Sequence, residues 1–219
     1  MGKTTHVGSQ DLQAAAAGRS DIALLVQRAA TRLIGALARH WLLLVNTAVG
    51  LYATLLALPA VLMATGHTEA ATLVYTLFSP LCHQLPERSF FLFGPQLTYT
   101  LQELEDLTGG SVPLRYIGSP TVGYKMAICQ RDVAIHVSIW LSGLLFALVR
   151  RRLRPMSLLT FAVLCVPMFL DGLGQLLGLW QSPWWTRVLT GVLFGTACVW
   201  LSYPYIEAGM RDVRSITES

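Results

Sequence analysis

Apolar residues in this chain are gathered into long runs that short polar stretches separate. Four runs are long enough to be membrane spans, and they cover residues 41–65, 133–149, 156–179 and roughly 185–203. A helix needs about 20 residues to cross a hydrocarbon layer of roughly 30 Å, because each residue advances it by about 1.5 Å. The pattern therefore predicts an all-α fold, a polytopic transmembrane helix bundle with four spans.

A fifth apolar run, at residues 70–81, is too short to span and ends directly in a polar motif. We interpret it as a re-entrant or interfacial half-helix. An alternative with five spans extends this helix to Phe93. That alternative places His83, Glu87 and Arg88 near the centre of the bilayer, at a cost of several kcal/mol.

The regions that flank the runs complete the predicted organisation. Residues 1–20 are rich in small and polar residues without apolar periodicity, whereas apolar residues recur at helical spacing between Ile22 and Leu37, opposite a face of arginines. A basic amphipathic helix of this kind can lie on an anionic leaflet or simply lead into the first span. The expected segments are a flexible tail (1–20), a basic amphipathic cytoplasmic helix (21–40), the transmembrane bundle (41–203) with an extracytoplasmic segment (66–132), and a cytoplasmic C-terminal tail (204–219).

Composition supports a membrane protein. Hydrophobic residues make up 53% of the chain and charged residues 13%, and the mean hydropathy is +0.52, whereas soluble domains carry about 25% charged residues. The net charge of +4 comes from basic residues beside the spans, and no nucleic-acid recognition module is visible. The predicted partner is therefore the lipid bilayer, with anionic lipid as a possible ligand, and not nucleic acid.

The distribution of basic residues predicts the orientation, since Lys and Arg are enriched in cytoplasmic loops. With the N-terminus inside, 11 of the 16 basic residues are cytoplasmic, including a cluster at residues 150–154. The other five are extracytoplasmic: Arg88, Arg115, Lys125, Arg131 and Arg187. Both chain termini are then expected in the cytoplasm, and the polar motifs on the outside.

Two polar motifs interrupt the apolar pattern, Cys82-His83-Gln84-Leu85-Pro86-Glu87-Arg88-Ser89 and Cys129-Gln130-Arg131-Asp132. Ionisable groups at the edge of a bilayer are costly and usually functional. Helical spacing puts Cys129, Asp132 and His136 on one face, and Asp171 and Gln175 one turn apart on a later span. The candidate site is Cys82, His83, Arg88, Cys129, Arg131, Asp132, His136, Asp171, Gln175 and Arg187.

Several kinds of chemistry fit these residues. Cys82 and Cys129 can form a disulfide in an oxidising compartment. Alternatively, a transition metal such as zinc can bind to Cys82, His83, Cys129, Asp132 and His136, although adjacent Cys and His lack the usual ligand spacing. A third possibility is a purely structural salt-bridge network. A phosphatase-like Cys-x5-Arg loop is disfavoured, because the segment has no glycine and contains a proline.

The sequence therefore predicts an outward-facing site for metal binding, for thiol redox chemistry, or for a lipid phosphate held by Arg88 and Arg131. The alternative is a non-catalytic accessory subunit of a larger membrane complex, with a structural disulfide between Cys82 and Cys129. Glycines four residues apart, at 174 and 178 and at 191 and 195, allow close packing of helices with each other or with other subunits. A transporter is least favoured, because few polar residues lie in the inner halves of the spans.

The combination of Cys82-His83-Gln84, Pro86-Glu87-Arg88-Ser89, Cys129-x-Arg131 and Leu170-Asp171-Gly172 resembles an uncharacterised family of bacterial and archaeal multi-helix membrane proteins, known as a domain of unknown function. The resemblance covers about residues 60–200 and implies a prokaryotic cytoplasmic (inner) membrane. Many members resemble Cys-x-Arg-Cys at the second motif, where this chain has Asp132. That difference weakens a cysteine-rich metal site, and the resemblance implies no substrate.

Overall fold

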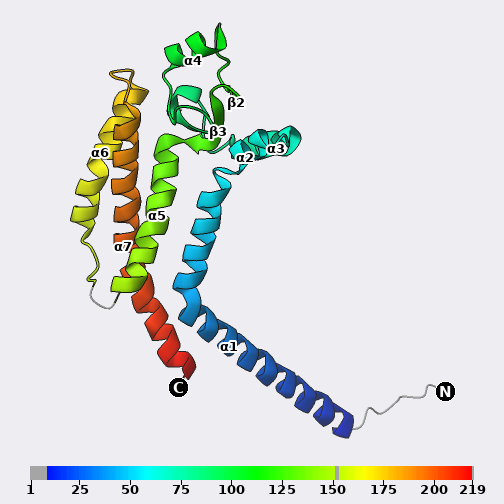
Figure 1. Ribbon diagram of the computed structural model, residues 1–219. Coiled ribbons are helices and arrows are strands. Elements are labelled where there is room, and N and C mark those ends of the chain that lie inside the picture. The colour runs from blue at the N-terminus through cyan, green and yellow to red at the C-terminus, as the bar shows by residue number, and fades with distance from the viewer. Residues whose placement is uncertain (1–8, 151–152, 219) are drawn as a thin grey trace, which may run out of the picture. The chain divides into compact units, whose positions relative to one another are not determined.

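The computed structural model describes residues 9–150 and 153–218 (Figure 1). These residues are mainly helical. Four helical stretches within them are long and apolar enough to cross a membrane: Ile22–Ala64, Gln130–Val149, Leu158–Leu176 and Trp184–Glu218. The predicted fold class, an all-α bundle with four spans, is confirmed.

The chain divides into two compact units, of which one holds both ends of the chain, up to Trp41 and from Ile206 onward. In this unit, α1 (Ser9–Leu55) and α7 (Trp184–Glu218) are joined by a buried hydrogen bond, whose acceptor also forms a contact within α7. Trp41 Nε1 donates to Glu207 Oε2 at 2.9 Å, and Arg214 Nη2 donates to Glu207 Oε1 at 3.0 Å. A satisfied carboxylate therefore fixes the contact between the two helices.

Both of these helices are longer than the sequence pattern suggested. Helix α1 begins at Ser9, inside the stretch expected to be a flexible tail, and continues without a break through the predicted amphipathic helix into the first span. Residues 1–8 lie outside the described part. Helix α7 likewise continues past Tyr203 to Glu218, although Pro204 lies inside it. The alanine run at residues 14–17 favours helix, and α1 contains no proline that would end it.

The second unit, Leu42–Tyr205, contains a helix break that was not predicted. Helix α1 ends at Leu55, and α2 (Leu58–Ala64) follows with Pro59 in its first turn. Proline has no N–H to donate, which favours a break at this position. The Leu56 carbonyl instead accepts a hydrogen bond from Ala127 N at 2.9 Å. The interruption thus ties the first span to the polar region.

The short apolar run forms α3 (Thr68–Phe78), eleven residues long. The helix does not continue to Phe93, because η1 (Pro86–Arg88), a single 3-10 turn, and the strand β1 (Ser89–Leu92) follow it. The five-span alternative is therefore wrong. Pro80 follows directly after the C-cap residue Ser79, and a proline there does not continue the helix, which therefore ends before the ionisable residues of the motif.

A small antiparallel sheet, which the sequence did not predict, joins the two polar motifs. Its strand order is β1-β3-β2, with β2 at Gly118–Ser119 and β3 at Gly123–Cys129. Helix α4 (Leu101–Thr108) lies between β1 and β2 in the chain and begins with a capping box formed by Thr100 and Glu103. Its Leu104 joins the buried cluster Phe91, Tyr99, Leu104 and Val122.

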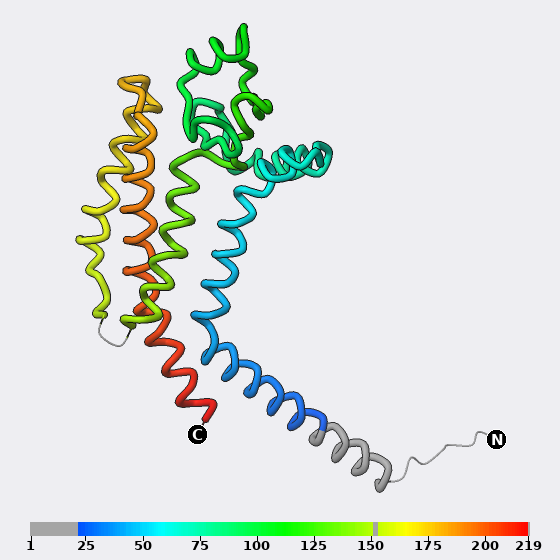
Figure 2. The backbone as a smooth tube through the Cα atoms, in the orientation of Figure 1, coloured from blue at the N-terminus to red at the C-terminus, as the bar shows by residue number. Residues whose placement is uncertain are grey.

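Helices α5 (Gln130–Val149) and α6 (Leu158–Leu176) run beside the part of α7 that belongs to this unit (Figure 2). A Cβ atom at Gly195 would lie 2.1 Å from Ser138 Oγ, and one at Gly191 would lie 2.7 Å from the Arg131 carbonyl oxygen. These glycines therefore allow close packing of α5 and α7, as their spacing predicted. Gly178 differs: it has a φ of +70°, and a Cβ atom there would meet none of the described residues within 4 Å.

Candidate functional site

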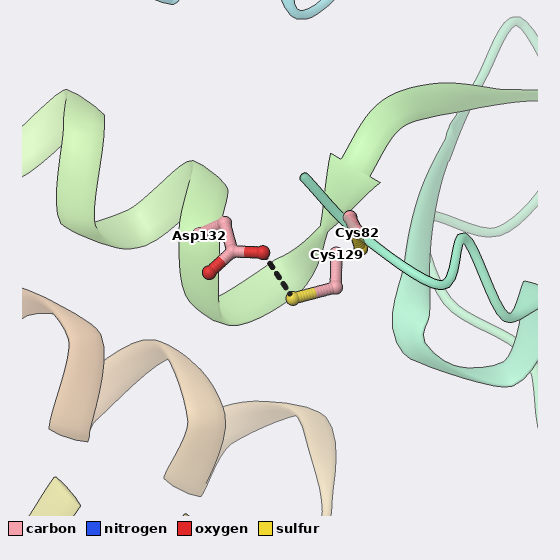
Figure 3. A group of neighbouring side chains, drawn as sticks. All are labelled: Cys82, Cys129 and Asp132. Carbon is pink, nitrogen blue, oxygen red and sulfur yellow. Dashed lines mark hydrogen bonds between the residues drawn. The ribbon is translucent and has the colours of Figure 1, made fainter. Parts of the chain in front are cut away.

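Two thiols and one carboxylate meet where β3 runs into α5 (Figure 3). Cys82 lies between α3 and η1, Cys129 is the last residue of β3, and Asp132 lies in the first turn of α5. One ligand atom from each of the three residues lies within 4.8 Å of the others. Both cysteines are half-buried and carry free thiols. We call this group the thiol cluster.

The sheet explains why the two motifs meet. Ser89 of β1 is paired with Cys129 of β3, so the register brings the end of the first motif beside the start of the second. Gln130 strengthens this junction, since its Nε2 donates to the Ser89 carbonyl at 3.0 Å. The segment after Cys82 is further held by Ser89 Oγ, which donates to the Leu85 carbonyl at 2.8 Å.

A buried lysine supports the loop that carries Cys82. Lys125 is 0% exposed, and its Nζ donates to the Gln84 carbonyl at 2.7 Å. Gln84 has a φ of +56°, and its side chain donates to the Tyr75 carbonyl at 2.8 Å. The Lys125 ammonium also lies 5.8 Å from the centre of the Tyr75 ring. Burial lowers the pKa of Lys125 to about 8, against the opposing effect of the nearby Cys82 charge.

The two thiols differ in how easily they lose a proton. A hydrogen bond from Cys129 lowers the pKa of Cys82 to about 6, and the Gln84 backbone N–H, 3.4 Å from Cys82 Sγ, acts in the same direction. The contact with Cys82, burial and the charge of Asp132 all raise the pKa of Cys129. Cys129 has one proton and two acceptors, the Cys82 sulfur and Asp132 Oδ2 at 3.0 Å. When Cys129 donates this proton to the Cys82 sulfur, Cys82 is the first thiolate to form.

His83 and Arg88 lie beside the thiol cluster. Together with Cys82, Cys129 and Asp132 they line a cavity of about 170 Å³. His83 is exposed, so its ring can turn toward or away from the thiols. The structure thus brings together five of the ten residues proposed from the sequence.

The other five proposed residues lie in separate arrangements. His136 does not join the thiol cluster: its Nδ1 is 2.7 Å from the Asp132 backbone oxygen, and its ring lies 4.7 Å from that of Tyr52. Arg131, Asp171 and Gln175 form a part-buried network with Ser182 and Trp180. Arg187 instead donates to Gln130 Oε1 at 3.1 Å.

We call Asp171 with Arg131, Gln175, Trp180 and Ser182 the Asp171 network. Both carboxylate oxygens of Asp171 have partners in it. Arg131 forms a salt bridge with Asp171 Oδ2, to which Gln175 Nε2 also donates at 3.1 Å. Ser182 Oγ and Trp180 Nε1 donate to the other oxygen. This part of the candidate site therefore matches the structural salt-bridge alternative.

The sequence reasoning missed the roles of Lys125, Gln84, Gln130 and Ser182. A charged residue inside the apolar segment 122–128 was the available signal for a buried lysine. Gln130 has no comparable signal, because its partner Ser89 lies 41 residues away, and the contact of Ser182 with Asp171 depends on how the chain turns between α6 and α7.

Comparisons with known proteins find similarity to predicted membrane proteins. Residues 121–201, which include the second cysteine motif and Asp171, match the family described as "Predicted membrane protein (DUF2085)". The "Uncharacterized protein MJ1492" of Methanocaldococcus jannaschii is 25% identical over 133 residues, which cover 60% of this chain and 67% of that protein. No solved structure matches the chain significantly. The resemblance to an uncharacterised membrane-protein family is thereby confirmed.

Proposed function

We propose that the protein is a metal-binding membrane protein in which Cys82, Cys129 and Asp132 hold a thiophilic divalent cation such as zinc. The observation that carries this proposal is the close approach of three ligand atoms, all within 4.8 Å. Ligands bound tetrahedrally to one zinc ion at about 2.0–2.3 Å lie about 3.3–3.8 Å apart, roughly 1 Å less than the upper limit of the separations here. Only a small movement would therefore bring the three atoms onto one ion.

The chemistry of the cluster supports the same proposal. A metal needs deprotonated sulfur, and the pKa of Cys82 is lowered to about 6. Asp132 lies 3.0 Å from the Cys129 sulfur and would take part as an oxygen ligand once the shared proton has left. His83, which lines the same cavity, is the proposed fourth ligand, and it would complete a tetrahedral set of two sulfurs, one oxygen and one nitrogen.

Lys125 has a supporting role in this proposal. Two thiolates and a carboxylate carry three negative charges, which a divalent cation only partly neutralises. The buried ammonium of Lys125 near Cys82 offsets the remaining charge. We place the site on the extracytoplasmic side of a prokaryotic cytoplasmic membrane because of the excess of basic residues in the predicted inner loops.

Thiol redox chemistry is the second candidate, and the contact between a low-pKa thiol and a protonated partner favours it. In that reaction the Cys82 thiolate would attack an external disulfide and release one thiolate from it. Cys129, after loss of its proton, would then attack the mixed disulfide and release the second thiolate. The pair would end as a Cys82–Cys129 disulfide, with two electrons transferred to the external disulfide.

Metal analysis combined with mass mapping of free thiols separates the two candidates. The full chain is purified in detergent without chelator or reductant, together with Cys82→Ser and Cys129→Ser. Cys198→Ser is the matched control, because this thiol is also half-buried but lies outside the thiol cluster. The proposal predicts about one zinc ion per chain in the wild type and control, and nearly none in the two cluster variants.

A metal-free protein with Cys82 linked to Cys129 would contradict metal binding. If that disulfide forms and breaks reversibly with an added dithiol, thiol redox chemistry is supported. If it resists reduction and the protein copurifies with a larger complex, the accessory-subunit alternative is supported instead.

A further inference from the structure

A second, larger cavity lies apart from the thiol cluster. Its volume is about 510 Å³, and it opens between the segment that leads into α4 and the start of α7. Most of its lining is polar and uncharged, and Arg187 is the cation among its lining residues. Representative lining residues are Gln96, Thr98, Gln130, Gln181, Ser182 and Arg187. Cys82, Cys129 and Asp132 do not line it.

Arg187 is a buried cation that has only neutral partners. It is 6% exposed, and its Nη1 donates to Gln130 Oε1 at 3.1 Å and to the Glu87 carbonyl at 3.3 Å. Within residues 9–150 and 153–218 no carboxylate lies within 4 Å of its guanidinium. A buried charge without a counter-ion is costly. An anionic ligand would remove this cost.

The free donors of Arg187 indicate where such a ligand would bind. The Nε atom is buried and has no hydrogen-bond partner among the residues that the structure describes. The Nη2 atom also forms no hydrogen bond with a described residue. Unlike Nε, it is not among the polar atoms that are fully shielded from solvent. Nη2 is therefore the guanidinium nitrogen left free to donate, on a residue that lines the cavity.

The carboxylates in the lining form no salt bridge with Arg187 among the described residues, and Glu87 acts on it only at longer range. Glu103 belongs to the capping box of α4, where its Oε2 accepts from Thr100 N at 2.7 Å and from Thr100 Oγ1 at 2.8 Å. The Glu87 carboxylate lies 3.9 Å from Arg88 Nε, and only the backbone oxygen of Glu87 contacts Arg187. Both acidic groups thus have other partners.

We propose that this cavity binds a phosphate group, either free or carried by a lipid headgroup, with Arg187 as its principal cation. Guanidinium donors match phosphate oxygens well, and the amides and hydroxyls of the lining can satisfy the remaining oxygens. Trp184 also lines the cavity, and Trp180, Trp184 and Trp185 are each about half exposed. Tryptophan gathers at the headgroup level of membranes, which makes a lipid phosphate accessible to this cavity.

The test uses the full chain and two probes. Inorganic phosphate is titrated into detergent-solubilised protein by calorimetry, and lipid retention is measured by native mass spectrometry after incubation with phosphatidylglycerol or phosphatidylcholine. Binding of inorganic phosphate identifies a free phosphate site. Retention of phosphatidylglycerol over phosphatidylcholine, without binding of inorganic phosphate, identifies an anionic lipid headgroup as the source.

Arg187→Gln is expected to weaken binding of the active probe at least about tenfold, because it removes a charge-assisted contact. The matched control is Arg115→Gln, which removes the same charge from an exposed position outside the cavity and is expected to leave affinity unchanged. Gln181→Glu provides a second variant that keeps Arg187. It adds a carboxylate of the same shape at an exposed lining position, and it is also expected to weaken binding.

The proposal is overturned if neither probe binds the wild type. It is equally overturned if Gln181→Glu binds as tightly as the wild type, which decides the matter even where Arg187→Gln does not fold. Cys82→Ser is expected to bind phosphate normally, so this result is independent of the metal site.

Discussion

The thiol cluster and the Asp171 network each contain a carboxylate, but the two carboxylates are used differently. Both carboxylate oxygens of Asp171 have side-chain partners. Three side chains donate hydrogen bonds to them, and Arg131 forms a salt bridge. Asp132 accepts a single side-chain hydrogen bond within the described chain, from the thiol of Cys129. A carboxylate whose two oxygens both have partners contributes to structure. A carboxylate that accepts only the proton of a neighbouring thiol remains available to bind a metal ion.

Replacing Asp171 should produce the largest loss of stability. Asp171→Asn leaves Arg131 charged and without its counter-ion, although the Arg131 and Asp171 side chains are only 19% and 12% exposed. Breaking such a buried pair costs roughly 3–5 kcal/mol. We expect a loss of this size in the free energy of unfolding, measured by circular dichroism during denaturation in mixed micelles.

Glu218→Gln is the matched control for this variant. It breaks the salt bridge between Arg39 and Glu218, whose side chains are 50% and 55% exposed. An exposed pair contributes about 0–1 kcal/mol. Equal losses in the two variants would mean that the Asp171 network does not have the structural role assigned to it.

Lys125→Met should alter the thiol cluster through charge. Removing the ammonium near Cys82 destabilises the thiolate, so the pKa of Cys82 should rise from about 6. An increase of about one pH unit corresponds to roughly 1.4 kcal/mol. The measurement is the pH dependence of iodoacetamide labelling in chelator-treated protein, with Cys165 and Cys198 as internal references. An unchanged or lower midpoint would exclude this role of Lys125.

Asp132→Asn should shift the same midpoint in the opposite direction. The negative charge of Asp132 raises the pKa of both cysteines, so its removal lowers the pH at which Cys82 becomes reactive. We expect a decrease of less than about one unit, since Asp132 is only one of several causes. Midpoints that move together in Lys125→Met and Asp132→Asn would contradict the electrostatic description of the cluster.

A small effect on stability is expected from Cys129→Ala in metal-free protein. Its thiol donates one hydrogen bond to Asp132, and Asp132 is only half-buried, so water can replace the lost donor. The expected loss is below about 1.5 kcal/mol. A loss as large as that of Asp171→Asn would show that both clusters are structural.

The sequence predicted the depth of residues along the helices better than their partners. Apolar runs locate the spans, and the separation of Gln175 from Asp171 correctly places both in one network. Helical spacing also placed His136 one turn after Asp132. It could not show that the His136 ring lies against Tyr52, because that contact depends on the rotation of one helix against another.

The sheet and the burial of Lys125 could not be predicted from the sequence pattern, for a related reason. The register of strand β3 with β1 is defined by pairing across about 40 residues, between Ser89 and Cys129. Lys125 is buried only because the Gln84 carbonyl and the Tyr75 ring accommodate its ammonium. Neither partner can be identified from periodicity, so the polar residues were grouped into one site instead of several.

X-ray absorption spectroscopy of the zinc-loaded protein tests the central claim most directly. The account predicts two sulfur ligands at about 2.3 Å and two nitrogen or oxygen ligands at about 2.0–2.1 Å, with one sulfur lost in Cys82→Ser. A first shell of nitrogen and oxygen alone, or a spectrum that Cys82→Ser leaves unchanged, would contradict a metal site at Cys82, Cys129 and Asp132.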